Sequence, residues 1–255
     1  MRHSVQAPAA GRVFDLIVVG SEAAGLSAAL RAAERGAHVA VITASAPLAA
    51  SSPRAQGGVA AAVGADDSAG LHAADTLAVG GGLNDAGAVA VLTEAGTRLL
   101  DSALPFETDL GLEAGHRRRR ILHAGDGITG HVLTSALLAR ATASPRIALL
   151  DHQPVDELIR LGGRVSGVQV RSRVLLGHAV VLASGGYAAL WRRSTNAPST
   201  RGSGLALAWR AGASLADLEF VQFHPTALFV PGRPSLLLSE ALRGEGWPSD
   251  RRGRP

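Results

Sequence analysis

The sequence predicts an α/β fold of the Rossmann-like, three-layer kind, and three adjacent segments carry that prediction. Asp15-Leu-Ile-Val-Val-Gly20 is a short apolar run that enters a glycine turn, as a buried parallel strand does. Residues 23–35 have a helical composition and are followed by Gly36, which suits a helix end. Residues 38–43 form a second apolar run. Together these segments predict one βαβ unit.

Further elements follow in order along the chain. Residues 46–65 are rich in Ser, Pro and Gly and are expected to form a loop, and Gly162-Gly163 is expected to close a hairpin. An Asn84/Asp85 pair is expected to cap the second of four further helices. These helices are expected at residues 68–79, 85–102, 133–143 and 204–211. Strands are expected at residues 147–151, 155–161, 164–171 and 180–183.

Composition excludes several classes of chemistry. With 255 residues, 47% of them hydrophobic, the chain can bury one large domain, or one plus a small second. All 25 basic residues are arginine, so the sequence has neither a P-loop lysine nor a Schiff-base lysine. It also has no cysteine, which excludes disulfides, thiolate metal sites and a cysteine nucleophile within this sequence. The net charge of +4 fits biased codon use better than nucleic-acid binding, and no metal site is expected.

No targeting or membrane segment is expected. The first apolar stretch, residues 16–20, is too short for the hydrophobic region of a secretory signal. Glu22 interrupts the longer stretch 16–30, which therefore does not suit a membrane span. A cytoplasmic protein is the expectation.

The turn after the first strand has the spacing of a dinucleotide-binding loop. Gly20-Ser21-Glu22-Ala23-Ala24-Gly25 follows a predicted strand and opens a helix, whose free N–H groups suit a pyrophosphate. Gly20 permits the tight turn, and Gly25 permits close packing of helix on strand. We therefore expect all six residues at the cofactor. The alternative is an ordinary α/β turn with coincidental glycines.

Glu22 departs from the loop pattern, because glycine is usual where the backbone approaches the phosphates. At about 5 Å and an effective dielectric constant near 20, repulsion from one phosphate charge is roughly 3 kcal/mol. That energy corresponds to about two decades of affinity, less if the side chain turns into water. Weakened rather than abolished cofactor binding is expected.

Five later motifs point to one family. They are residues 51–58 (SSPRAQGG), 112–126 (LEAGH, then RILHAGD), 181–186 (VLASGG), 219–226 (EFVQFHPT) and 239–246 (SEALRGEG). With the first turn, they resemble the L-aspartate oxidases, members of the succinate dehydrogenase and fumarate reductase flavoprotein family. The resemblance covers nearly the whole chain but only the N-terminal half of a family member. The 112–126 stretch is the most discriminating.

The resemblance implies FAD as the cofactor. FAD would be held noncovalently, because Ser51 stands where the respiratory relatives carry a flavin-linked histidine. Ser203 stands where the family usually has an aspartate that contacts FAD, a second departure at the cofactor. The further residues that the resemblance places at FAD are Ser52, Ala55, Gln56, Gly57, Gly58, Ser184 and Gly185.

The resemblance also implies a substrate site. Glu113 would lie near the ammonium group of aspartate, where dicarboxylate-specific relatives carry an uncharged amide. His224 and Ser239 would bind a substrate carboxylate. Glu240 and Arg243, three residues apart on one helical face, would relay protons to a catalytic arginine that this sequence does not contain.

Two neighbouring features have simpler interpretations. The arginine run 117–120 fits a solvated face better than a nucleic-acid site. His116 and His123 have no ligand partners at metal-binding spacing and are expected to be structural.

The implied reaction is FAD-dependent oxidation of L-aspartate to iminoaspartate, an early step of NAD biosynthesis. Hydride would pass from the substrate Cα to flavin N5, with oxygen or fumarate as the acceptor and quinolinate synthase downstream. The expected fold class is thus an α/β, Rossmann-like three-layer FAD-binding domain with a β-rich insertion. This domain is expected to span residues 13–218 and to be incomplete. The start of a truncated capping domain follows at 219–255.

Two alternatives remain open. In the first, the chain is a fragment of a fumarate reductase or succinate dehydrogenase flavoprotein. In the second, it is a non-enzymatic remnant of an FAD-binding protein. Because family motifs beyond residue 246 are missing, the 255-residue chain is expected to be inactive or impaired alone.

Overall fold

The computed structural model describes residues 13–99, 104–113, 115–224, 227–228, 230 and 235–237. The described chain divides into two units. The first contains the residues up to Arg54 and Thr134–His224, and the second contains mainly Ala55–Leu133. Each unit is described by itself.

A six-stranded mixed sheet forms the first unit, in the order β6-β2-β1-β9-β8-β7. β1 pairs in parallel with β2 and β9, and β2 pairs in parallel with β6. β8 pairs antiparallel with both β9 and β7, which makes the predicted β-rich insertion. The strands are β1 (Phe14–Val19), β2 (Val39–Ile42), β6 (Ile147–Leu150), β7 (Glu157–Leu161), β8 (Arg164–Val170) and β9 (Arg173–Leu182). The predicted α/β class is confirmed.

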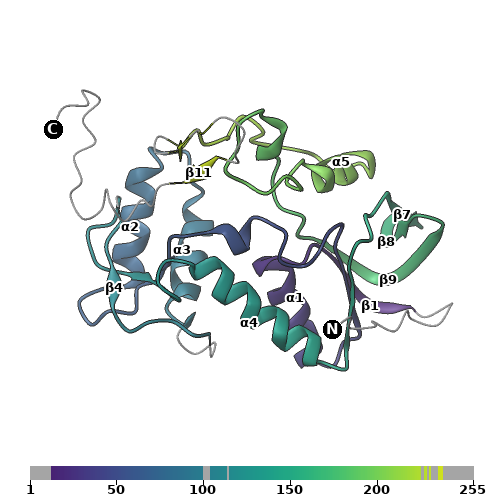
Figure 1. Cartoon of the computed structure of the whole chain (residues 1–255), viewed down its shortest axis with the longest axis horizontal. Coiled ribbons are helices and arrows are strands. Elements are labelled where there is room, and N and C mark those ends of the chain that lie inside the picture. Colours follow the sequence, from purple (N-terminus) through teal and green to yellow (C-terminus); the bar gives the residue numbers. More distant parts are fainter. Residues whose placement is uncertain are drawn as a thin grey trace. The chain divides into compact units, whose positions relative to one another are not determined.

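Alternate side chains of β1 pack on opposite faces of this sheet. Ile17 and Val19 pack into one buried cluster, together with Leu207 of α5 (Ser203–Arg210). Val18 packs into another, together with Ala29 of α1 (Ala23–Glu34). Because both faces are covered, β1 reads as a continuous apolar run rather than an alternating one. Figure 1 shows α1 beside β1.

β9 is much longer than the predicted strand 180–183. Its first half pairs with β8, and its second half pairs with β1 (Figure 1). The part that pairs with β8, residues 173–176, begins with the exposed Arg173, and Gly177 and His178 separate it from the apolar residues 179–182, so the sequence pattern marks only the end of the strand. The turn between β7 and β8 agrees with the prediction, because Gly162 and Gly163 both have positive φ, +57° and +81°.

The second unit contains two helices and a small sheet. α2 (Ala69–Val79) begins where Ser68 Oγ accepts a hydrogen bond from the Leu71 N–H (3.2 Å). α3 (Ala86–Gly96) begins where the Asp85 carboxylate accepts from the Ala88 N–H (2.7 Å), as the predicted cap requires. The three-stranded sheet, in the order β3-β5-β4, consists of β3 (Val59–Ala60), β4 (Leu110–Gly111) and β5 (Ile121–Leu122).

α4 (Thr129–Ala143) begins at Thr129 rather than at the predicted Leu133. Thr129 Oγ1 accepts a hydrogen bond from the Ala124 N–H (3.1 Å), so a local contact fixes a start that the hydrophobic pattern does not show. Residues 46–65, expected to be a loop, also contain β3 and the short helix η1. The remaining short elements are η1 (Ser52–Arg54), η3 (Ala188–Leu190), β10 (Ala227–Leu228) and β11 (Leu236–Leu237).

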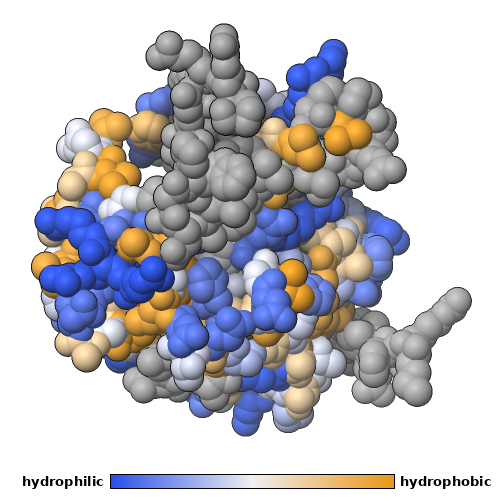
Figure 2. Space-filling view, turned by 60° about the vertical axis from the view of Figure 1, so that its left-hand side comes forward, coloured by the Kyte–Doolittle hydropathy of each residue, from blue (hydrophilic) through white to orange (hydrophobic). Residues whose placement is uncertain are grey.

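The surface mixes polar and apolar residues. Figure 2 shows hydrophobic residues interspersed with hydrophilic ones on the face turned forward. In the second unit, large apolar side chains remain exposed at Val79, Leu83, Val91 and Leu92. Among the described helices, none combines the length and the apolar composition needed to cross a membrane.

Candidate functional site

The turn after β1 has the geometry of a dinucleotide loop. Gly20 has φ +118°, and a Cβ at this position would lie 2.2 Å from the Ala183 carbonyl oxygen. A Cβ on Gly25 would lie 2.1 Å from the Gly20 carbonyl oxygen. Neither contact tolerates a side chain, so the strand, the turn and the first helical turn approach one another as a pyrophosphate-binding loop requires. The structure therefore supports the tight turn predicted at Gly20 and the close helix–strand packing predicted at Gly25, while their contact with a cofactor stays a prediction.

Glu22 points away from its own helix. It is the residue before α1, yet its side chain makes no capping hydrogen bond. Instead, Glu22 Oε2 accepts hydrogen bonds from the Ser52 N–H (2.6 Å) and the Ser52 hydroxyl (2.7 Å). Buried Ser21 donates from Oγ to the Pro47 carbonyl oxygen (3.3 Å). Both side chains thus tie the first turn to the segment after β2.

The glycine turn after β9 lies beside the first turn. Gly185 has φ +73°, and a Cβ built on it would lie 3.7 Å from Glu22 Oε1. A Cβ on Gly204 would lie 1.8 Å from Ser184 Oγ, so the start of α5 packs directly on this turn. Ser203, the first residue of α5, is exposed there.

These segments line one pocket of the first unit, at the carboxyl ends of β1, β2 and β9. Neighbouring strands on the two sides of β1 come from different parts of the chain, and such a switch point is where open α/β sheets bind ligands. Lining residues include the predicted Gly20, Ser21, Glu22, Ser184 and Ser203.

The pocket also includes residues that sequence reasoning missed. Thr43, Ser199 and Thr200 contribute to its lining. Thr43 follows β2 directly, and its position at a strand end is a signal that could have identified it. Thr200 Oγ1 lies 2.8 Å from Ser51 Oγ, across 149 residues of sequence, and no local signal marks that pairing.

The residues present fit a dinucleotide at the turn glycines and oppose it at one place. Gly20 and Gly25 leave the backbone room that a phosphate needs. The Glu22 carboxylate adds a negative charge to the same pocket. Two further motifs that the resemblance assigns to FAD, 51–58 and 181–186, nevertheless reach this pocket: Ser184 lines it, and Ser52 is hydrogen-bonded to Glu22 of its lining.

In the second unit, the structure brings the later part of the motif 51–58 and the predicted substrate glutamate, Glu113, together. A Cβ on Gly57 would lie 3.2 Å from Glu113 Oε1, and one on Gly58 would lie 2.3 Å from Ile121 Cγ2. The Ala55 carbonyl oxygen accepts a hydrogen bond from the Gly130 N–H (2.9 Å). Gln56 is partly buried. Glu113 Oε1 is buried and has no hydrogen-bond partner among the described residues.

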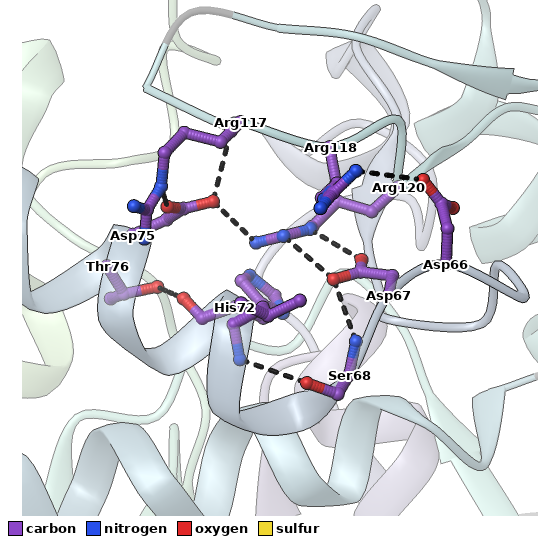
Figure 3. A network of polar contacts seen from close by, with 10 residues as sticks. Asp66, Asp67, Ser68, His72, Asp75, Thr76, Arg117, Arg118 and Arg120 are labelled. Atoms are coloured by element: carbon purple, nitrogen blue, oxygen red, sulfur yellow. Dashed lines mark hydrogen bonds and ion pairs between the residues drawn. The ribbon is translucent and has the colours of Figure 1, made fainter.

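An arginine and two aspartates form a buried network near this segment (Figure 3). Arg120 is fully buried and donates from Nε and Nη2 to the two oxygens of Asp67 (2.8 and 2.9 Å). Its Nη1 lies 3.1 Å from Asp75 Oδ2, close enough for an ion pair but without hydrogen-bond geometry. Arg117 also bonds to Asp75, through its backbone N–H (3.0 Å) and its guanidinium. The predicted solvated face is therefore wrong for Arg120, because its charge is compensated inside the unit.

Two histidines lie beside that network. The rings of His72 and His116 are 5.5 Å apart between centroids. Burial, with the neighbouring Arg120 charge, lowers the pKa of both imidazoles below the ordinary value of 6.5. For Asp75, burial alone would raise the pKa, but hydrogen bonds and charge from Arg117, and the charge of Arg120, lower it overall. No group of side chains suited to a metal ion occurs in the described ranges.

The capping-domain residues are only partly visible. His224 belongs to the first unit and is partly buried. The expected substrate residue Ser239 and the expected catalytic pair Glu240 and Arg243 lie outside the described residues.

Known proteins are similar to this chain in sequence and in fold. The chain is 43% identical over 246 residues to the L-aspartate oxidase of Agrobacterium fabrum, covering 90% of this chain and 47% of that protein. It is 39% identical over 257 residues to L-aspartate oxidase 1 of Ralstonia nicotianae, covering 91% and 48%. A quinol fumarate reductase structure from E. coli superposes with a TM-score of 0.83 and 28% identity, covering 92% of this chain and 43% of that one.

The matches confirm the predicted resemblance to the L-aspartate oxidases, and FAD as the predicted cofactor. The chain spans about half the length of the curated relatives it matches. A family profile described as "FAD binding domain" matches residues 15–248, most of the chain. Together with the glycine turns and the switch-point pocket, this match shows that the chain belongs to the FAD binding domain family.

Proposed function

We propose that this chain is the FAD-binding part, with the ammonium-recognising glutamate, of an enzyme that oxidises L-aspartate to iminoaspartate. The observation that carries the proposal is the position of Glu113. Its Oε1 is buried, has no hydrogen-bond partner among the described residues, and faces Gly57 of the motif 51–58.

A buried, unpaired carboxylate oxygen costs free energy that a ligand can recover. Leaving such an acceptor unsatisfied costs about 1–3 kcal/mol, and more for a charged group. The ammonium group of an amino acid offers both an N–H donor and a positive charge. A dicarboxylate without an ammonium offers neither, so Glu113 favours aspartate over succinate or fumarate.

The other parts of the proposal follow from the resemblance. Bound FAD would accept the two electrons and the Cα hydrogen of aspartate. His224 and Ser239 would bind a substrate carboxylate, and Glu240 and Arg243 would relay protons. The FAD-binding domain would extend over residues 13–218 and the start of the capping domain over 219–255.

The cellular setting is likewise part of the proposal. Oxygen or fumarate would serve as the electron acceptor, and quinolinate synthase would act downstream. The enzyme would work in the cytoplasm, without contact to nucleic acid or membrane.

The experiment that tests this function joins residues 13–246 to the C-terminal half of the Agrobacterium fabrum L-aspartate oxidase. The readout is bleaching of the visible flavin band by L-aspartate or by succinate under anaerobic conditions. Glu113→Gln is expected to raise the KM for aspartate about 10- to 100-fold, because a charge-assisted hydrogen bond is lost. Glu107→Gln is the matched control, since Glu107 is an exposed carboxylate of the same unit that accepts from the Asp126 N–H.

Two results would contradict the proposal. One is an unchanged KM for aspartate in Glu113→Gln. The other is faster bleaching by succinate than by aspartate in the unsubstituted chimera, which would favour a dicarboxylate dehydrogenase instead.

A further inference from the structure

Glu22 lies among three segments that the family motifs assign to the cofactor. Its backbone belongs to the first glycine turn, its Oε2 is bonded to Ser52 of the second motif, and its Oε1 faces Gly185 of the third. The residue is only partly exposed and lines the pocket of the first unit. A single carboxylate therefore occupies the place where these segments meet.

The donors that Glu22 uses are those that a phosphate would use. A backbone N–H and a hydroxyl, both from Ser52, point at one carboxylate oxygen at 2.6 and 2.7 Å. Phosphate and carboxylate oxygens accept the same charge-assisted hydrogen bonds. Next to these donors, the start of α1 leaves its own first N–H groups without a side-chain cap. The pocket thus offers an anion site that the chain has partly filled with its own side chain.

We propose that Glu22 is a built-in competitor for the pyrophosphate of FAD, so that the Glu22–Ser52 hydrogen bonds must break before the cofactor binds tightly. The inference rests on FAD being the cofactor of the proposed function. It differs from simple repulsion, because it requires that Ser52 change its partner from the carboxylate to the ligand.

Two separable effects follow. The charge of Glu22 repels a phosphate, by about two orders of magnitude in affinity at about 5 Å and an effective dielectric constant near 20. The hydrogen bonds of Glu22 withhold the Ser52 donors. Glu22→Gln removes the charge but leaves an acceptor for Ser52, whereas Glu22→Gly removes both and restores the usual loop residue.

The experiment titrates FAD into the cofactor-free 255-residue chain and follows quenching of flavin fluorescence. Glu22→Gln is expected to bind FAD more tightly than the unsubstituted chain, and Glu22→Gly more tightly still, by about 100-fold in total. Ser52→Ala should weaken FAD binding in the Glu22→Gly background but change it little in the unsubstituted chain, a coupling that charge alone does not produce. Glu34→Gln is the matched control, because Glu34 is an exposed carboxylate at the other end of α1.

The outcomes separate this inference from the proposed function. Equal FAD affinity in the unsubstituted chain and both Glu22 variants would overturn the inference, and tight binding in all three would leave the cofactor of the proposed function in place. Weaker binding in Glu22→Gly, with a lower melting temperature, would overturn it in favour of a structural tie. If no variant binds FAD, and ADP also fails to stabilise Glu22→Gly against heat, both the inference and the cofactor assignment fail.

Discussion

Replacing Arg120 with methionine is expected to cost the second unit about 3–5 kcal/mol of unfolding free energy, because a buried ion pair loses one partner. The Arg120 side chain has no exposed area, nor has that of Asp67, and Asp75 is 3% exposed. Asp67 would lose the two hydrogen bonds that it now accepts from Arg120. Methionine fills much of the volume and Asp75 keeps its bonds to Arg117, so the lost stability would come from the uncompensated Asp67 carboxylate rather than from a cavity.

The matched control is Arg118→Met in the same arginine run. Arg118 pairs with Asp66 at 3.2 Å, but the two side chains are 47% and 72% exposed. An exposed pair contributes only about 0–1 kcal/mol. The double variant Arg120→Met/Asp67→Asn should recover part of the loss, since it removes the orphaned charge.

The assay is urea denaturation at neutral pH, with hydrogen exchange of the α2 amides to localise the loss. The reasoning is refuted if Arg120→Met and Arg118→Met lie within about 1 kcal/mol of each other. It is also refuted if the double variant is less stable than Arg120→Met alone.

Two further predictions concern a glycine and the histidine pair. Gly20→Ala should lower the melting temperature and abolish FAD retention, because its Cβ would meet the Ala183 carbonyl. The control Gly36→Ala, at φ +92° with open space around it, should cost only about 1–2 kcal/mol of unfolding free energy. Equal losses of stability in the two variants would contradict this reasoning. His72 and His116 have lowered pKa values in the folded chain. Their contribution to folding stability is therefore complete above pH 6.5, the ordinary histidine pKa, and is lost as the pH falls through their lowered pKa values in the folded chain. Replacing both with Gln should flatten the decline in urea midpoint between about pH 7.5 and about pH 5, and an unchanged slope would refute the assignment.

The elements that sequence reasoning predicted well are those with a local signal. The first βαβ unit is marked by apolar runs, a glycine turn and Gly36 at the helix end. Asp85 begins α3 with the expected side-chain cap, and Ser68 begins α2, close to the predicted helix start, with a cap of the same kind. Each signal depends on residues within a few positions of one another, and no tertiary contact overrides it.

The errors come from contacts that the local sequence pattern does not show. Arg120 looks like part of a solvated arginine run, yet its partner Asp67 lies 53 residues earlier and makes burial possible. The first half of β9 depends on pairing with β8, not on its own pattern. Thr200 reaches the pocket through a fold-dependent contact with Ser51.

Glu22 and Glu113 show why residue type alone does not define a site. From sequence, each is a carboxylate in a flavoprotein motif. In the structure, Glu22 Oε2 accepts two short hydrogen bonds from Ser52, whereas Glu113 Oε1 is buried with no partner in the described part of the chain. A ligand that donates to an already satisfied acceptor gains little binding free energy. A ligand that donates to an unsatisfied buried acceptor removes that acceptor's desolvation penalty, and binds more tightly for it. This difference supports both proposals: Glu113 would receive the substrate ammonium, and Glu22 would have to give up its hydrogen bonds before the pocket binds a phosphate.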